Sequence, residues 1–155
     1  MIPLPFQRSL TNKPIMALSD IRRKLRELTI TDKLVEAIGT QAERAVHERT
    51  LQGKDMNNRK FKPYAKSTEK SRKKQGRSTG NVTLTDKGFM LSNITSKREG
   101  SKAVVFFSKT AENNKAHGHH VGTKHLPPRK FFGIGKKLAG QIMAKTQAHF
   151  KKVIG

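Results

Sequence analysis

The feature that most constrains the fold is a stretch of helical periodicity between Thr31 and Gly53. Its apolar residues recur so that they share one side of a helix with 3.6 residues per turn. They are Leu34, Val35, Ile38, Ala42, Ala45 and Val46. Thr31-Asp32 is a pair that favours a helix start, and Gly53 is a typical stop. We therefore expect a long amphipathic helix that packs one face against the rest of the protein.

The second half of the chain has the patterns of a small sheet followed by a helix. The segment 103–107 is rich in valine and phenylalanine, which favour strands, and Glu99-Gly100-Ser101 suits a tight turn. This predicts a hairpin of strands 93–97 and 102–109. A third strand is expected at 115–122, after a turn at 112–114, and a closing helix at 135–154.

Two shorter helices are also expected, one from Ser19-Asp20 to about Leu28 and one over 87–91, capped by Thr85-Asp86. The predicted class is therefore α+β: N-terminal helices, a small antiparallel sheet with a hairpin, and a C-terminal helix.

Two segments lack such periodicity. Residues 1–18 contain three prolines among apolar residues, which indicates an extended arm suited to docking on a neighbouring subunit. Residues 54–81 are interrupted by Asn, Pro and Gly and are strongly basic, which predicts an irregular basic loop that orders on a partner. The rest, residues 19–155, suits a single domain.

The charge of the chain indicates anionic partners. It carries 33 Lys and Arg against 11 Asp and Glu, a formal net charge of +22. Such an excess favours encounter with nucleic acid, anionic membranes or acidic proteins. Within the basic loop, the candidate contacts with DNA or an acidic partner are Arg72, Lys73, Lys74 and Arg77.

The composition also excludes several classes. Cysteine is absent, so there is neither a disulfide framework nor a thiolate metal site. No apolar run approaches the ~20 residues that span a bilayer, and the first residues do not resemble a secretion signal, so we expect a soluble protein without a membrane partner.

No arrangement typical of catalysis is present. Four histidines lie close together, at positions 117, 119, 120 and 125. Imidazoles bind metals, but alternate residues of a strand point to opposite faces, so a structural or surface role is favoured over a metal site. A histidine–metal nuclease would also need an acid or asparagine ligand beside a general base, and no such set is visible. We predict no catalytic, cofactor-binding or metal site, and no enzyme.

A proline and aromatic segment precedes the last helix. Pro127-Pro128 removes two backbone donors and ends the sheet. Phe131 and Phe132 each bring about 150–250 Å² of surface that can be buried, which would fix the C-terminal helix to the body. Arg129 suits either a surface charge or a fork-shaped anchor across an interface.

Four segments together carry a family resemblance. The first is the amphipathic helix near 31–50, and the second runs from Phe61-Lys62-Pro63-Tyr64 to Ser71-Arg72-Lys73-Lys74. The third, 84–94, is similar to a "Leu-x-x-x-Gly-x-Leu-x-x-Ser-Ile" step. The fourth contains His120, Gly122, Pro127, Pro128, Arg129, Phe131 and Phe132. In this order they resemble the phage virion morphogenesis family, which includes tail-completion and head–tail joining proteins.

The resemblance implies a structural virion protein of a tailed phage. Such proteins are small α+β subunits of rings at the neck or tail end, and no reaction is expected of them. The implied partners are further copies in a ring, hexameric or of higher order, together with portal or connector and tail tube or terminator proteins. Packaged DNA would be contacted without sequence specificity, and assembly would take place in the host cytoplasm.

Two alternatives stay open. A basic module that binds DNA or RNA without sequence specificity fits the charge equally well. A histidine-dependent nuclease ranks third.

Overall fold

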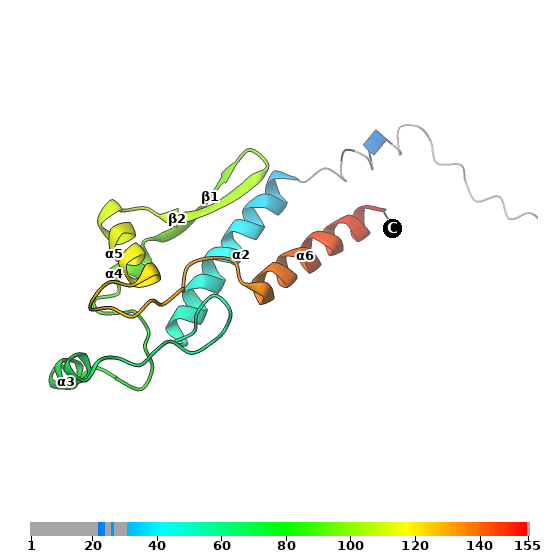
Figure 1. Ribbon diagram of the computed structural model, residues 1–155. Helices are drawn as coiled ribbons and strands as arrows, with labels where there is room; N and C mark the ends of the chain where they lie inside the picture. Colours follow the sequence, from blue (N-terminus) through cyan, green and yellow to red (C-terminus); the bar gives the residue numbers. More distant parts are fainter. Residues whose placement is uncertain (1–21, 24–25, 27–30, 155) are drawn as a thin grey trace, which may run out of the picture.

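The computed structural model describes residues 22, 23, 26 and 31–154, and it has the α+β class that the sequence predicts (Figure 1). The predicted arm at 1–18 lies outside the described residues. So does most of the helix predicted from Ser19, of which 22, 23 and 26 are helical. The elements are α2 (Asp32–Leu51), α3 (Lys66–Lys74), α4 (Phe89–Ser92), β1 (Ile94–Glu99), β2 (Lys102–Phe107), α5 (Thr110–Val121) and α6 (Lys136–Ile154).

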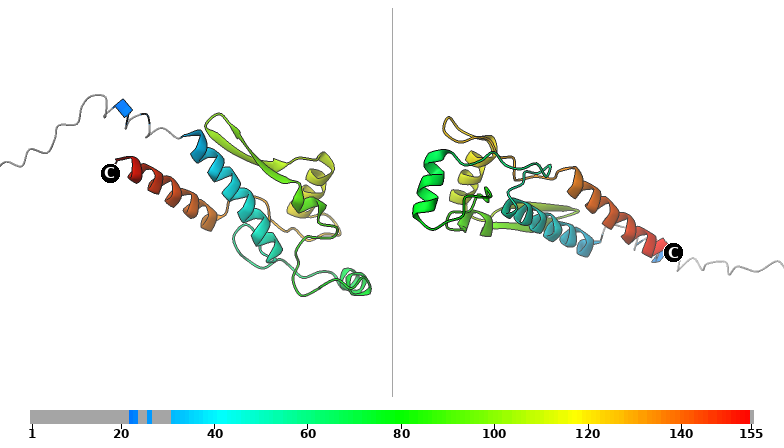
Figure 2. Two further views of the ribbon diagram at one scale, coloured as in Figure 1. Left: turned by 180° about the vertical axis from the view of Figure 1, so that it is seen from behind. Right: turned by 90° about the horizontal axis from the view of Figure 1, so that it is seen from below.

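Helix α2 organises the described part of the chain. The β1–β2 hairpin packs along one side of it and α6 along another, as the views in Figures 1 and 2 show. The Thr31 hydroxyl caps its start by accepting a hydrogen bond from the Leu34 amide at 3.2 Å. Gly53, at φ +72°, follows its end, so both predicted boundaries are confirmed. At Gly39 the hairpin comes so close that a Cβ would lie 3.3 Å from Ser96 Cβ.

The hairpin is also confirmed. β1 and β2 pair antiparallel, with Ile94 opposite Phe107 and Glu99 opposite Lys102, and Gly100 supplies the positive φ of the turn. Val105 and Phe107 pack against the core. Phe106 belongs to the opposite face, where the Lys97 ammonium lies 5.1 Å from the centre of its ring.

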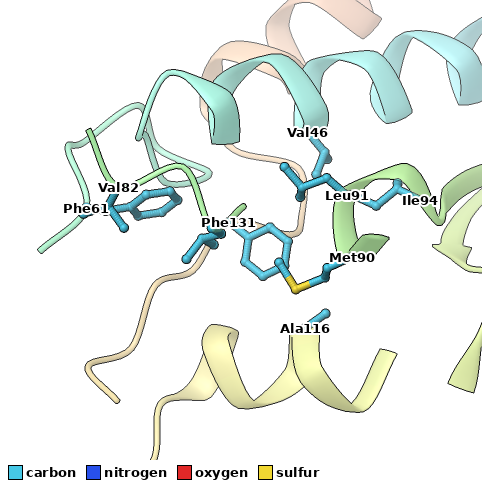
Figure 3. Packing of buried hydrophobic residues seen from close by; sticks show 9 residues of the cluster. Val46, Phe61, Val82, Met90, Leu91, Ile94, Ala116 and Phe131 are labelled. Carbon is cyan, nitrogen blue, oxygen red and sulfur yellow. The ribbon is translucent and has the colours of Figure 1, made fainter. Parts of the chain in front are cut away.

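The core lies where α2, α4 and α5 converge on the segment before α6 (Figure 3). Phe131 occupies its centre, and the side chain is completely buried. Its other buried members are Val46, Phe61, Val82, Leu84, Met90, Leu91, Ile94 and Ala116. These residues come from positions 46 to 131, so the core closes only when distant parts of the chain meet.

The predicted third strand at 115–122 is wrong, because this segment forms α5. The expected turn at 112–114 is instead the first turn of that helix. Glu112 and Ala116, four residues apart, are its buried positions, and Lys115 neutralises the Glu112 carboxylate at 2.9 Å. Two buried positions are too few to create a visible helical period, which explains the error.

The basic loop at 54–81 is less irregular than predicted. It contains α3, a nine-residue helix with five basic residues and no buried side chain. The segment has helix-forming residues but no apolar stripe, so helix propensity was the only indication of α3 in the sequence. The short turn predicted at 87–91 exists as α4, but its cap is Gly88 at φ +83° and not Thr85-Asp86.

Candidate functional site

The segment that joins α5 to α6, residues 126–135, is here called the strap. Phe131 fixes it to the body, with its ring centre 6.2 Å from that of His120 and 6.4 Å from that of Phe107. Phe132 instead lines a small apolar cavity of about 170 Å³ together with Leu138 and Ile142 of α6. Of the two phenylalanines predicted to pack α6, Phe132 therefore borders a cavity that α6 also lines, with its ring centre 5.1 Å from that of Phe107, and Phe131 packs in the body.

Arg49 of α2 also holds the strap, through hydrogen bonds to its backbone. Its Nη2 and Nε donate to the Phe131 carbonyl at 2.8 and 3.3 Å, and Nη2 also donates to the Gly133 carbonyl. The side chain is only 7 % exposed, and burial lowers the pKa of Arg49 while Asp55 acts in the opposite direction. The sequence patterns did not single out Arg49. The available signal was its place three residues after Val46, on the buried face of α2.

Arg129 is not a surface charge, one of the two roles predicted for it, because the residue is only 4 % exposed. The other role, an anchor across an interface, stays a prediction. Nη2 donates to the carbonyls of Lys62 and Pro63 at 3.2 and 3.3 Å, and the backbone amide donates to the His119 carbonyl at 2.8 Å. Arg129 therefore joins the strap to the segment before α3 and to α5. A fork-shaped guanidinium suits such carbonyl pairs, but their location could not be known from the sequence.

The other residues of the fourth predicted segment form a tight turn. Gly122 has φ +83°, and a Cβ there would lie 2.9 Å from both the Leu126 oxygen and the Pro128 nitrogen. Pro127 is half-buried and Pro128 exposed. Only glycine fits at 122, because any side chain would collide with the returning backbone. The turn positions Arg129 and, beyond it, Phe131.

The four predicted contact residues divide into two kinds. Arg72 is half-buried, lies 4.8 Å from the centre of the Tyr64 ring, and donates to the Ser78 and Thr85 carbonyls at 3.0 Å each. Arg77 forms an ion pair with Asp86. Both arginines thus stabilise the surroundings of α3. Lys73 and Lys74, in the last turn of α3, are exposed and available to a partner.

A pocket of about 390 Å³ opens between α3, the strap and α5, and is here called the Tyr64 pocket. Its walls include Tyr64, Arg72, His119, Leu126 and Arg129. Tyr64 Oη, His119 Nδ1 and Arg129 Nε are buried without a hydrogen-bond partner in the described structure. Most buried polar atoms in proteins are paired, so three orphans around one pocket call for an explanation.

The four clustered histidines occupy different environments. His119 and His120 are half-buried on α5, and His117 and His125 are exposed. Burial, followed by the charges of Arg129 and Lys115, lowers the pKa of His119. Burial, followed by Lys130 and His117, lowers the pKa of His120.

Across the described ranges, no three His, Asp or Glu side chains are grouped closely enough to hold a metal ion. No described helix combines the length and apolarity of a membrane span.

Comparison with protein-family models, curated proteins and solved structures finds no match to this chain.

Proposed function

We propose that this protein is a non-enzymatic structural component of a tailed-phage virion, completing the tail or joining head to tail as a subunit of a ring. One observation carries the proposal. The four segments that resemble the virion morphogenesis family contribute to a single core, through Val46, Phe61, Leu91 and Phe131 among others. Motifs that pack on one another belong to one structural unit, which is what a shared family fold requires.

The exposed surface supports assembly with further copies. Several large apolar side chains remain open to solvent, including Phe89 (59 % exposed), Ile134 (58 %) and Met143 (62 %). The sheet has two strands only in the described part of the chain, so both of its edges are available for pairing. A subunit that buries such features against neighbours gains apolar contact that it lacks alone.

The proposed ring would carry a high positive charge, because each copy brings +22. Like charges repel, so anionic neighbours would stabilise the assembly. Suitable neighbours are portal or connector proteins, tail tube or terminator proteins, and the phosphates of packaged DNA. Lys73 and Lys74 are the residues best exposed for these contacts.

The decisive experiment is negative-stain imaging of particles from a phage that lacks this protein, with and without the purified chain. Separate full heads and unjoined tails, rescued by the added protein, are expected. Met143→Lys should weaken both rescue and the oligomer measured by light scattering, while Gln147→Lys adds the same charge at an exposed polar position of the same helix. Intact, infectious particles without the protein would refute the joining role.

A second function has a specific observation in its favour. The exposed face of α3 presents Lys66, Lys70, Lys73 and Lys74, which suits contacts with a phosphate backbone. As a nucleic-acid module, the chain would bind duplex DNA as a monomer or dimer with affinity falling steeply as salt rises. A discrete oligomer that forms without nucleic acid would favour the ring instead.

A further inference from the structure

The Tyr64 pocket has an unbalanced charge. Three arginines line it, Arg72, Arg77 and Arg129, but among its lining residues Asp86 is the one acid. Asp86 forms an ion pair with Arg77. The partners of Arg72 and Arg129 are backbone carbonyls and the Tyr64 ring, so within the described structure neither guanidinium has a carboxylate at hydrogen-bond distance.

The orphan polar atoms are suited to an anion. Tyr64 Oη and Arg129 Nε are both hydrogen-bond donors, and each is buried without an acceptor. His119, which also lines the pocket, has a third buried atom without a partner, Nδ1. A buried donor without an acceptor is costly, and an anionic acceptor satisfies it best because charge-assisted hydrogen bonds are the stronger kind.

The size and walls of the pocket select the type of anion. Its volume of about 390 Å³ far exceeds the space that a single water molecule needs. Leu84, Leu126 and Pro127 make part of the wall apolar, which matches the methylene stem of a side chain. Arg129 is only 4 % exposed, so a duplex backbone, whose phosphates are attached to bulky sugars, is poorly shaped to reach it.

From this geometry we propose that the Tyr64 pocket receives a carboxylate side chain of a partner protein, with the carboxylate between Arg72 and Arg129 and its stem against Leu126 and Pro127. The guanidinium groups of Arg72 and Arg129 would donate to it. The pocket could be filled whether or not the chain forms a ring. The binding test below therefore fails or succeeds independently of the particle-joining test.

The test uses the full chain and nuclear magnetic resonance. N-acetyl-glutamate amide, which carries one side-chain carboxylate, is titrated at neutral pH and about 0.15 M salt, where surface attraction is screened. Signals of the His119 ring and of the Nε–H groups of Arg72 and Arg129 report on the pocket. N-acetyl-glutamine amide is the uncharged control, and dimethyl phosphate is a monoanion that represents a nucleic-acid backbone.

Two variants on α3 separate the pocket from the general surface charge. Thr68 lines the pocket and its neighbour Ser67 does not, while both are exposed in the first turn of the helix. Thr68→Glu places a competing carboxylate at the pocket and should weaken binding of the glutamate probe by about tenfold or more, whereas Ser67→Glu should change it by less than about twofold.

The expected result is saturable shifts at the three reporter side chains with the glutamate probe and none with the glutamine probe. Equal responses to the two glutamate variants, or shifts spread evenly over surface lysines, would overturn the proposal. Tighter saturable binding of dimethyl phosphate would also overturn it and assign the pocket to a nucleic-acid phosphate.

Discussion

Replacing Arg49 by methionine tests how the strap is held. The Arg49 guanidinium is the donor to two strap carbonyls, those of Phe131 and Gly133, which lie 82 and 84 residues further along the chain. Methionine keeps the apolar length of the side chain but has no donor. Arg49→Met therefore leaves both carbonyls without this partner and changes little else in shape.

The size of the expected destabilisation follows from the loss of the hydrogen-bond donor to these two carbonyls. A hydrogen bond from a charged donor contributes roughly 1.5–3 kcal/mol net of desolvation, so independent bonds to two carbonyls would contribute about 3–6 kcal/mol. The same Nη2 donates to both carbonyls, so the two contributions do not add in full. The expected loss of unfolding free energy is therefore about 2–4 kcal/mol. In urea this lowers the unfolding midpoint by roughly 1–2 M.

The assay is urea unfolding followed by far-ultraviolet circular dichroism. Arg44→Met is the matched control, because Arg44 lies on the exposed face of the same helix and its loss removes the same charge. Arg49→Lys keeps the charge but cannot fork between two carbonyls, so an intermediate loss is expected. Neutral surface changes alter the unfolding free energy by up to about 0.5 kcal/mol, which corresponds to about 0.3 M urea. An Arg49→Met midpoint within about 0.3 M of the Arg44→Met midpoint would therefore refute the reasoning.

Three further changes probe the strap and α5. Phe131→Ala empties the centre of the core and should cost about 3–5 kcal/mol in urea unfolding, against less than about 1 kcal/mol for the 59 %-exposed Phe89→Ala. Gly135→Ala should lower thermal stability by about 2–3 kcal/mol, because the new Cβ would overlap the Met56 carbonyl oxygen. The pKa of His119 is lowered in the folded protein, mainly by burial. The unfolded chain therefore binds the proton first, and stability should fall as pH drops below about 6.5 and through the folded pKa. His119→Gln should reduce that slope in urea midpoints measured across pH.

Each of these expectations has a contrary outcome. Equal costs for the two phenylalanine changes would mean that the strap does not enter the core. Gly140→Ala is the control for the glycine, since a Cβ there meets nothing within 4 Å and alanine favours a helix. Similar behaviour of both alanine variants would contradict the close approach at 135. An unchanged pH slope without His119 would remove that residue as its source.

Elements with strong local patterns could be predicted from the sequence. The apolar period of 34–46 gave α2, and valine and phenylalanine at 103–107 around a glycine turn gave the hairpin. The C-terminal helix was expected at 135–154 and begins at Lys136. In each case local propensity and tertiary packing favour the same structure, so a short window was informative.

Other parts could not be predicted because their cause is distant in sequence. α3 and α5 lack an apolar stripe, with no buried residue in the former and two in the latter. The carbonyl partners of Arg49 and Arg129 lie 66 to 84 residues away. The Tyr64 pocket likewise exists only once the strap has crossed the body and placed Arg129 opposite α3.

The contacts of the arginines that lie at least half-buried also bear on how such a chain can vary. Arg49, Arg72 and Arg129 donate to backbone carbonyls, which every residue type possesses. Positions that supply only a carbonyl, such as Lys62 and Ser78, can change residue type without losing these hydrogen bonds. Sequences with this architecture can therefore diverge widely at the acceptor positions while the arginines and the sterically required Gly122 stay fixed. Relatives would share these few arginines and the turn glycine, while their overall sequence identity to this chain would be low.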